Sequence, residues 1–176
     1  FPMRASRDKA YMVADQRFAA GRPDVLCFTT EPLAGDVTFA GGIRAVLQAA
    51  ISTTDADFVV KLIDVWPDNT EYPGYQMLVR GDIMRGRYRR SFSAPEPFTP
   101  GEPTEVAFTM PDIAHTFRKG HRIMVQVQSS WFPLADRNPQ QFVDIYRCAA
   151  SDFIPCDVRI YHDRRRPSRL EVLRLR

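Results

Sequence analysis

Residues 119–140 have the sequence KGHRIMVQVQSSWFPLADRNPQ, which predicts a β-strand that starts at a Gly-His-Arg turn and ends in an aromatic, Pro-broken loop. The apolar residues Ile123, Val125 and Val127 alternate with polar ones. A period of two residues is typical of a strand with one face in a core. We therefore expect these three side chains to point into a β-sandwich.

Other segments of the chain repeat this pattern. Apolar and polar residues also alternate in residues 43–51, 75–83 and 106–110. Residues 58–66, FVVKLIDVW, are apolar on both faces except for Lys61 and Asp64, which fall on opposite faces, so this strand is expected to be covered on both sides. Weaker strands are expected at residues 24–30, 36–40, 157–162 and 168–175, and a helical turn within residues 140–150. The spacing predicts an all-β sandwich of about nine or ten strands.

Composition supports one soluble domain with many short elements. The chain has 176 residues, 44% of them hydrophobic, and a formal net charge of +3. Its 14 Pro residues favour an all-β design, because Pro is excluded from helix interiors and central strands. The charges are interleaved, and no apolar run reaches the length of a membrane span, so neither a nucleic acid nor a membrane is expected as a partner.

The domain boundary is placed where the predicted strands begin, after residue 22. We expect residues 1–22 to be a linker from a missing upstream domain and residues 23–176 to be the folded domain. The chain starts at Phe1 rather than Met, which indicates a processed product or a fragment. The compartment stays open, with a periplasmic or secreted location favoured over a cytoplasmic one.

No catalytic or metal-binding motif is present. A Ser nucleophile of the elbow type needs a G-x-S-x-G sequence, and the chain contains none. His115 and His121 are six residues apart and belong to no metal-ligand pattern. We therefore predict no catalytic residue, no metal site and no cofactor in this chain.

The three Cys residues cannot all pair with one another. Cys27, in the apolar run VLCF, is expected to be buried as a small hydrophobic residue. Cys148 and Cys156 flank the segment CAASDFIPC, which either forms a disulfide in an oxidising compartment or holds two free thiols.

The loop that follows the predicted strand of Ile123, Val125 and Val127 is the main candidate site. It carries the following candidate interdomain or cleft-facing residues: Trp131, Phe132, Asp136, Arg137 and Asn138. One hypothesis is an aromatic wall with polar groups at a binding cleft. The alternative is a structural loop, fixed by an Asp136–Arg137 pair over an aromatic plug.

Three further polar residues are expected to be structural: Asp64, His121 and Arg122. Asp64 lies among apolar residues and needs a buried partner, for which an Arg is expected. His121 is expected to tie its turn to a neighbouring acceptor. The basic run MRGRYRR, residues 84–90, is interpreted as a solvated edge strand whose Arg residues pair with acids, rather than as a phosphate site.

Several ordered motifs resemble one hydrolase family. They are DQRF (15–18), RPDVL (22–26), EPL (31–33), DADFVVKLIDVWPD (55–68), GYQMLVRGDIMRGRYRRSF (74–92), VQVQSSWFP (125–133) and DRNPQ (136–140). They resemble the C-terminal domain of the family that contains X-Pro dipeptidyl peptidases, cocaine esterases, glutaryl cephalosporin acylases and α-amino acid ester hydrolases. Cys27, the Gly41–Gly42 pair and CAASDFIPC depart from the family pattern.

The resemblance implies a jelly-roll (galactose-binding-like) sandwich that packs on an upstream α/β-hydrolase domain. That upstream domain would supply the Ser, His and Asp and take the ester or amide substrate, so this chain alone is expected to be inactive. The domain would then support the catalytic domain and border its substrate entrance. The alternatives are a carbohydrate-binding module, with Trp131 as its platform, or an oligomerisation module that forms a homo-oligomer.

Overall fold

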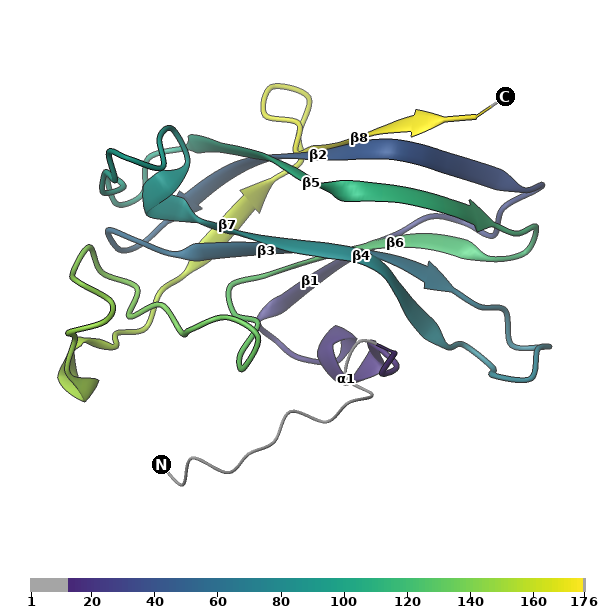
Figure 1. Ribbon diagram of the computed structural model, residues 1–176, viewed down its shortest axis with the longest axis horizontal. Coiled ribbons are helices and arrows are strands. Elements are labelled where there is room, and N and C mark those ends of the chain that lie inside the picture. Colours follow the sequence, from purple (N-terminus) through teal and green to yellow (C-terminus); the bar gives the residue numbers. More distant parts are fainter. Residues whose placement is uncertain (1–12, 176) are drawn as a thin grey trace.

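Eight strands form two layers in the computed structural model, which describes residues 13–175 (Figure 1). The strands are β1 (Val25–Thr29), β2 (Val37–Ile51), β3 (Asp57–Val65), β4 (Gln76–Arg85), β5 (Thr104–Phe117), β6 (Arg122–Gln128), β7 (Val158–Tyr161) and β8 (Arg169–Arg174). The helical elements in the described range are α1 (Arg17–Ala20) and the 3₁₀ turns η1 (Gly86–Tyr88) and η2 (Ala150–Asp152). None of them is long and apolar enough to cross a membrane.

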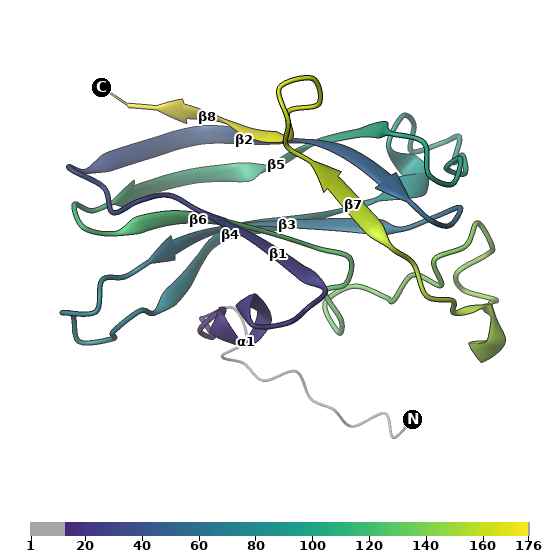
Figure 2. The same cartoon turned by 180° about the vertical axis from the view of Figure 1, so that it is seen from behind.

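The two layers are antiparallel sheets. One has the order β1-β6-β3-β4, and the other has the order β5-β2-β7 with β8 also paired to β2. Figure 2 shows β1 in front of one layer and β7 in front of the other, on the same side of the molecule. The all-β jelly-roll sandwich predicted from the sequence is therefore confirmed.

The strand count is eight rather than nine or ten. The segments expected as separate strands at 36–40 and 43–51 form the single strand β2, with a register shift between Gly41 and Ile43. Gly41 has a φ of +94°, a conformation that a residue with a side chain rarely adopts. The Gly-Gly pair thus bends the strand without ending it. The helical turn expected within 140–150 is absent from the described residues of that range, and η2 begins only at its end.

The core lies between the inner faces of the sheets. Phe58, Val60 and Leu62 of β3 belong to it, and so does Val127 of β6, while the side chains of Ile123 and Val125 pack against it. The inward direction predicted for the three β6 residues is confirmed. Every residue of β3 except Val65 is buried, so the prediction of a strand covered on both sides is also correct.

The outer face of β3 is covered by two segments, α1, which precedes β1, and the loop that follows β6. α1 lies across the sheet that contains β1, β6, β3 and β4 (Figure 1), and the loop after β6 brings Trp131 onto β4. α1 lies in the stretch expected as a linker, while residues 1–12 fall outside the described residues.

Candidate functional site

Lys61 occupies the centre of the covered outer face. Its side chain is 1% exposed, and Nζ donates a 2.9 Å hydrogen bond to Oε1 of Gln16, just before α1. Nζ also lies 4.8 Å from the ring centre of Trp131 and 5.7 Å from that of Phe18. A buried ammonium needs such partners because water is excluded from it.

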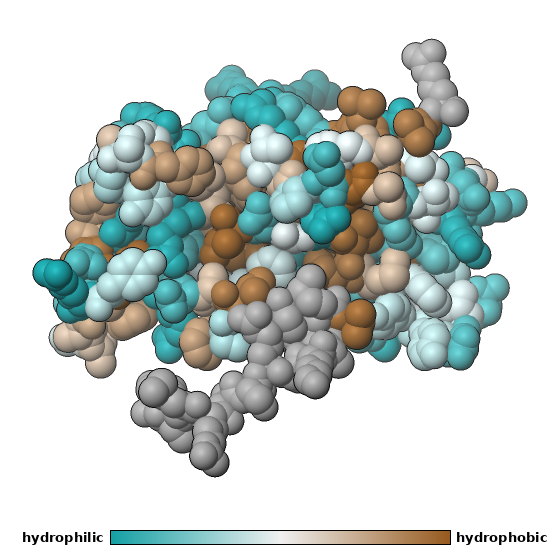
Figure 3. All heavy atoms as spheres, in the orientation of Figure 1, coloured by the Kyte–Doolittle hydropathy of each residue, from teal (hydrophilic) through white to brown (hydrophobic). Residues whose placement is uncertain are grey.

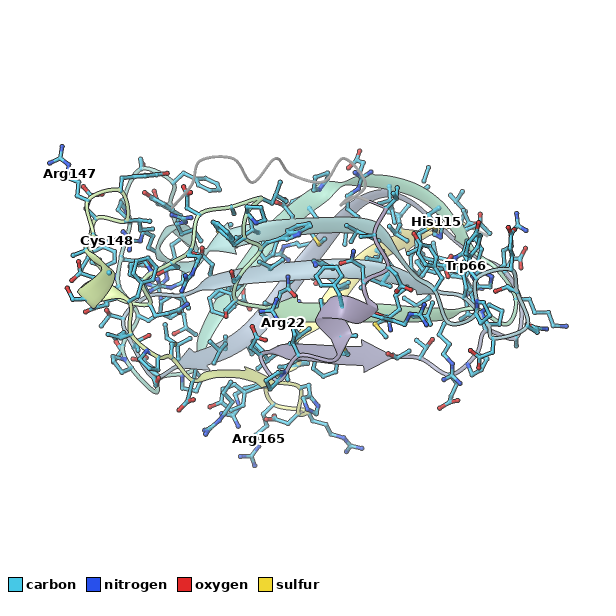
Figure 4. All side chains as sticks on the ribbon, turned by 90° about the horizontal axis from the view of Figure 1, so that it is seen from below. Arg22, Trp66, His115, Arg147, Cys148 and Arg165 are labelled. Atoms are coloured by element: carbon cyan, nitrogen blue, oxygen red, sulfur yellow. The ribbon has the colours of Figure 1, made fainter. Side chains whose placement is uncertain are left out.

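Burial also changes the acidity of this lysine. Desolvation lowers the pKa of Lys61 from 10.5 to about 8, and the positive charge of Arg22 adds to the effect. Figure 4 shows Arg22 beside α1, on the same side of the sheet. At neutral pH the ammonium is charged, and it links α1 to the loop after β6.

Trp131 packs against the sheet where Gly81 of β4 leaves room for it. A Cβ atom at Gly81 would come 2.5 Å from Cη2 of Trp131. Trp131 is half-buried, whereas the carbohydrate-binding alternative needs it as an exposed platform. Phe132, which follows it, is 62% exposed.

Asn138 anchors the far end of the same loop. Its side chain is 5% exposed, and Nδ2 donates to Oδ2 of Asp55 at 3.0 Å and to Oδ1 of Asp57 at 2.8 Å. Its Oδ1 accepts a 2.8 Å bond from the backbone N–H of Gln140. Because both carboxylates precede or begin β3, Asn138 joins the loop to a core strand.

Arg87 makes a second connection between the loop and Asp55. Its Nε donates to Oδ2 of Asp55 at 2.7 Å, and its Nη1 donates to the carbonyl oxygen of Val143 at 2.7 Å. The guanidinium lies 4.9 Å from the ring centre of Phe142. The long segment between β6 and β7 is therefore held by buried, charge-assisted hydrogen bonds, which are the strong ones.

The basic run that contains Arg87 is more buried than we predicted. Arg87 is 7% exposed, and the Arg89 side chain is 5% exposed, with its guanidinium 3.9 Å from the ring centre of Phe98. The predicted pairing with acids is correct, since Arg85, Arg87 and Arg89 lie near Asp57, Asp55 and Glu96 respectively. The predicted edge strand is correct for Met84 and Arg85, which end the edge strand β4. Its predicted solvation is wrong for Arg87 and Arg89, which are buried at η1 and directly after it.

Asp57, which accepts a hydrogen bond from Asn138 in this network, is buried at the start of β3. Burial raises its pKa from 3.8 to about 6, although Asn138 and Arg85 oppose the shift. Asp55 adds to the rise as a neighbouring negative charge.

Asp136 and Arg137 do not fix the loop as expected. Within residues 13–175 they form no ion pair with each other. Arg85 donates a 3.3 Å bond to the carbonyl oxygen of Asp136, and the Arg137 guanidinium lies 5.2 Å from the ring centre of Phe153. Asn138 is the residue of this motif that carries the anchoring role.

The segment between β6 and β7 exposes a series of apolar side chains. Each of the following is at least 36% exposed: Phe132, Leu134, Phe142, Tyr146, Phe153 and Ile154. Figure 4 shows the end that carries Arg147 and Cys148 opposite the end that carries Trp66 and His115. Figure 3 shows apolar side chains scattered over the visible face among hydrophilic ones.

At the opposite end, Asp64 joins the two histidines that the sequence keeps apart. Its Oδ2 lies 2.9 Å from Nε2 of His115, and its Oδ1 lies 2.8 Å from Nδ1 of His121. His115 belongs to β5 in the other sheet, so the carboxylate ties the two layers together. The expected Arg partner is wrong, since Arg122 instead donates to the carbonyl oxygen of Thr30 at 3.2 Å and lies near Glu31.

The cysteines are free thiols. Cys27 is exposed on β1, contrary to our prediction, because it lies on the outer side of an edge strand. Cys148 and Cys156 are unpaired, and Thr53 Oγ1 donates to Cys156 Sγ at 3.0 Å. Among the described residues, no group of three or more His, Cys, Asp or Glu side chains is arranged to hold a metal ion.

Gly81 and Gln16, which contact Trp131 and Lys61 on the outer face of the sheet, were not predicted from the sequence. Gly81 interrupts an alternating strand, and an isolated Gly in a strand often marks a close approach by another group. The isolated Gly81 could therefore have indicated this close approach. No local sequence pattern indicates the burial of Gln16, because that burial depends on the docking of α1.

The comparisons with known proteins agree on one family. A cocaine esterase from Rhodococcus sp. (strain MB1 Bresler) is 44% identical over 125 residues, which cover 71% of this chain and 21% of that protein. An aminopeptidase from a marine sediment Thaumarchaeota archaeon aligns over 94% of this chain and 28% of its own, with a TM-score of 0.91 and 44% identity. An α-amino acid ester hydrolase aligns over 92% and 27%, with a TM-score of 0.89 and 47% identity.

The chain thus spans between about a fifth and under a third of the length of these relatives. Residues 4–171 match the family described as the X-Pro dipeptidyl-peptidase C-terminal non-catalytic domain. Because this match covers nearly the whole chain, the protein belongs to the family of X-Pro dipeptidyl-peptidase C-terminal non-catalytic domains.

Proposed function

We propose that this chain is the non-catalytic jelly-roll part of a serine hydrolase that acts on esters or amides, of the dipeptidyl-peptidase or α-amino acid ester hydrolase/acylase class. It would support an upstream α/β-hydrolase domain and border the entrance to that domain's active site. The similarity to a cocaine esterase, an aminopeptidase and an α-amino acid ester hydrolase, each much longer than this chain, supports the proposal.

The observation that carries the proposed role is the loop of residues 131–138. Its two ends are held by buried contacts, at Trp131 against Gly81 and at Asn138 against Asp55 and Asp57. Between them Phe132 is 62% exposed. A loop that is fixed in position yet presents an aromatic side chain is suited to form one wall of a cleft, because little conformational entropy is lost when a partner or substrate packs against it.

The test uses the longer polypeptide that carries these residues together with its catalytic domain. Phe132→Ser is compared with wild type on p-nitrophenyl esters and α-amino acid esters of increasing acyl size. We expect KM to rise about fivefold or more for the larger acyl groups, with kcat changed less, because the loop contributes to binding rather than to chemistry.

Leu173→Ser is the matched control, since Leu173 is 66% exposed on β8 in the other sheet. Its kinetic constants should equal those of wild type. Equal constants for Phe132→Ser would remove the entrance role. The supporting role is tested separately by proteolytic separation of the two domains, after which the thermal stability of the catalytic domain should fall.

The two alternatives differ in what supports them. The carbohydrate-binding hypothesis depended on Trp131 as a platform, and this ring instead packs against Gly81 and Lys61. The oligomerisation hypothesis stays a separate prediction. Light scattering of the 176-residue chain distinguishes a monomer from a homo-oligomer.

A further inference from the structure

A row of residues crosses the outer face of the sheet that contains β1, β6, β3 and β4. In this row Lys61 of β3 lies opposite Gln126 of β6 on one side and opposite Gly81 of β4 on the other. Lys61 is 1% exposed and Gln126 is 0% exposed. Figure 1 and Figure 4 show α1 over the strands of this sheet. A buried polar layer therefore lies between the sheet and the segment that contains α1.

Gln16 docks the segment of residues 13–20 on this layer. Its backbone N–H donates to the carbonyl oxygen of Gln76 at 3.0 Å, and its own carbonyl oxygen accepts from Nε2 of Gln126 at 3.5 Å. Its Oε1 accepts the 2.9 Å bond from Nζ of Lys61. Within residues 13–175 the Lys61 ammonium makes no other hydrogen bond and no ion pair. It therefore depends strongly on Gln16, because a buried charge without a partner is costly.

The same Lys61 side chain contacts Trp131, where the loop of residues 131–138 begins. Nζ lies 4.8 Å from the centre of the Trp131 ring. A Cβ atom at Gly81 would lie 2.5 Å from Cη2 of Trp131 and 3.3 Å from Cγ of Lys61, so both side chains occupy the space that Gly81 leaves. The carbonyl oxygen of Trp131 accepts a 3.0 Å bond from the backbone N–H of Ala135. The packing of Trp131 on Lys61 and Gly81 therefore fixes the start of the loop.

We propose that Lys61 is a positioning residue that couples the docking of residues 13–20 to the position of the loop of residues 131–138. Without its acceptor on Gln16 the ammonium moves toward water, and it then no longer faces the Trp131 ring. Displacement of the ring in turn admits water to the ammonium and weakens its bond to Gln16. Coupling between contacting groups is reciprocal, so a change at either end is felt at the other.

The consequence of this coupling for activity rests on the proposed function. Residues 13–20 lie on the N-terminal side of the sandwich, where an upstream catalytic domain would join it. The loop of residues 131–138 is the one proposed to border the entrance to that domain's active site. A displacement of the junction would then alter the substrate entrance through one buried cation.

Native-state hydrogen exchange of the 176-residue chain tests the coupling without any assay of activity, once a cooperative thermal transition has shown that the chain is folded. The amide of Gln16, bonded to Gln76, reports the docking of the segment, and the amide of Ala135, bonded to Trp131, reports the loop. Gln16→Leu should accelerate exchange at Ala135 about fivefold or more. Trp131→Leu should accelerate exchange at Gln16 by a similar factor. The two variants act from opposite ends, so either one is decisive if the other fails to fold.

Lys61→Met decides whether the cation carries the coupling. In the Lys61→Met background, the added effect of Gln16→Leu on exchange at Ala135 should fall below about twofold. A merely structural Lys61 would leave the effects of the two substitutions additive. Additive effects, or unchanged exchange at Ala135 in Gln16→Leu alone, would overturn the proposal.

Gln48→Leu is the matched control for Gln16→Leu. Gln48 lies in β2 of the other sheet, and its Nε2 donates to Oε2 of Glu105 at 2.8 Å. This variant should leave exchange at Gln16 and Ala135 unchanged. Acceleration at both amides in Gln48→Leu would mean that they report global stability, and the coupling through Lys61 would then be rejected.

The longer polypeptide separates this coupling from the proposed function. Gln16→Leu and Lys61→Met should each raise KM for the larger acyl groups about threefold, as Phe132→Ser does, with kcat changed less. If Phe132→Ser leaves KM unchanged while the exchange effects are present, the entrance role fails and the coupling stands. If Phe132→Ser raises KM while the exchange effects are absent, the coupling through Lys61 fails and the entrance role stands.

Discussion

Lys61 donates a 2.9 Å hydrogen bond from Nζ to Oε1 of Gln16, so a buried side chain of β3 fixes the segment that precedes α1. The two residues are 45 positions apart in the sequence. The same ammonium faces the Trp131 ring, and one cation therefore contacts both segments that cover the outer face of the sheet.

This contact predicts a pH dependence of stability. The folded state loses the Lys61 proton at about pH 8, whereas the unfolded state keeps it up to about pH 10.5. Between these values the unfolded state binds more protons, so the contribution of Lys61 to the free energy of unfolding rises with pH. Neutral Lys61 still donates to Gln16 and no longer carries a desolvated charge.

Lys61→Met removes the titrating group while keeping the volume similar. At pH 7 we expect a change in the free energy of unfolding within about 1 kcal/mol, because the loss of a buried charge offsets the loss of its hydrogen bond. Wild type should then gain stability relative to Lys61→Met between about pH 8 and pH 10.5, measured by urea denaturation. Exposed Lys119→Met gives the baseline, and a difference that stays constant with pH would contradict the prediction.

Gly81→Ala should disturb the packing of Trp131. The new Cβ would lie 2.5 Å from Cη2 and 3.0 Å from Cζ3 of the indole. Overpacking of this kind typically costs about 1–3 kcal/mol. We expect a loss of stability of that size in chemical denaturation and stronger quenching of tryptophan fluorescence by acrylamide, as the ring moves outward.

Gly35→Ala is the control for this substitution, because a Cβ atom added at Gly35 would meet nothing within 4 Å. Its stability should change by less than about 0.5 kcal/mol. If both Ala variants behave alike, close packing of Trp131 on Gly81 is not important for stability.

The strands and their faces could be predicted because they depend on local alternation. The directions of Ile123, Val125 and Val127, and the two-sided burial of residues 58–66, follow from a period of two and from apolar content. The register shift at Gly41 was harder to predict, since a Gly pair suits a turn between two strands as well as a bend within one.

The polar contacts could not be predicted because they join residues that are distant in the sequence. Asp64 meets His115 across the two sheets, and Asn138 meets Asp55 and Asp57 from more than 80 residues away. Local sequence indicated that Asp64 needs a buried partner, but only the topology decides which side chain reaches it. Cys27 shows the opposite error, since an apolar run does not distinguish a central strand from an edge strand.

Asn138→Ala should destabilise the chain and release the loop. It removes the donors to two buried carboxylates and leaves both less satisfied, for which we expect a loss of about 2–4 kcal/mol. Cleavage by trypsin after Arg147 should accelerate, because the segment between β6 and β7 loses one of its two connections to Asp55. Asn69→Ala, at an exposed position, should leave stability and cleavage rate unchanged. Slow cleavage in both variants would mean that Arg87 alone holds the loop.

Thiol chemistry distinguishes the structure from the disulfide alternative. Cys27, Cys148 and Cys156 are free, so denatured protein without reductant should take up three iodoacetamide groups, measured by mass spectrometry. In the folded protein Cys27 should react, because it is exposed on an edge strand.

The reaction rate of Cys27 at about pH 7.5 should be below that of a free thiol. Partial burial of the sulfur raises the pKa of Cys27 and reduces the thiolate fraction. Since thiolate is the reactive form, the rate should continue to rise above about pH 9. Uptake of a single group without reductant, and three with it, would show that Cys148 and Cys156 pair in solution.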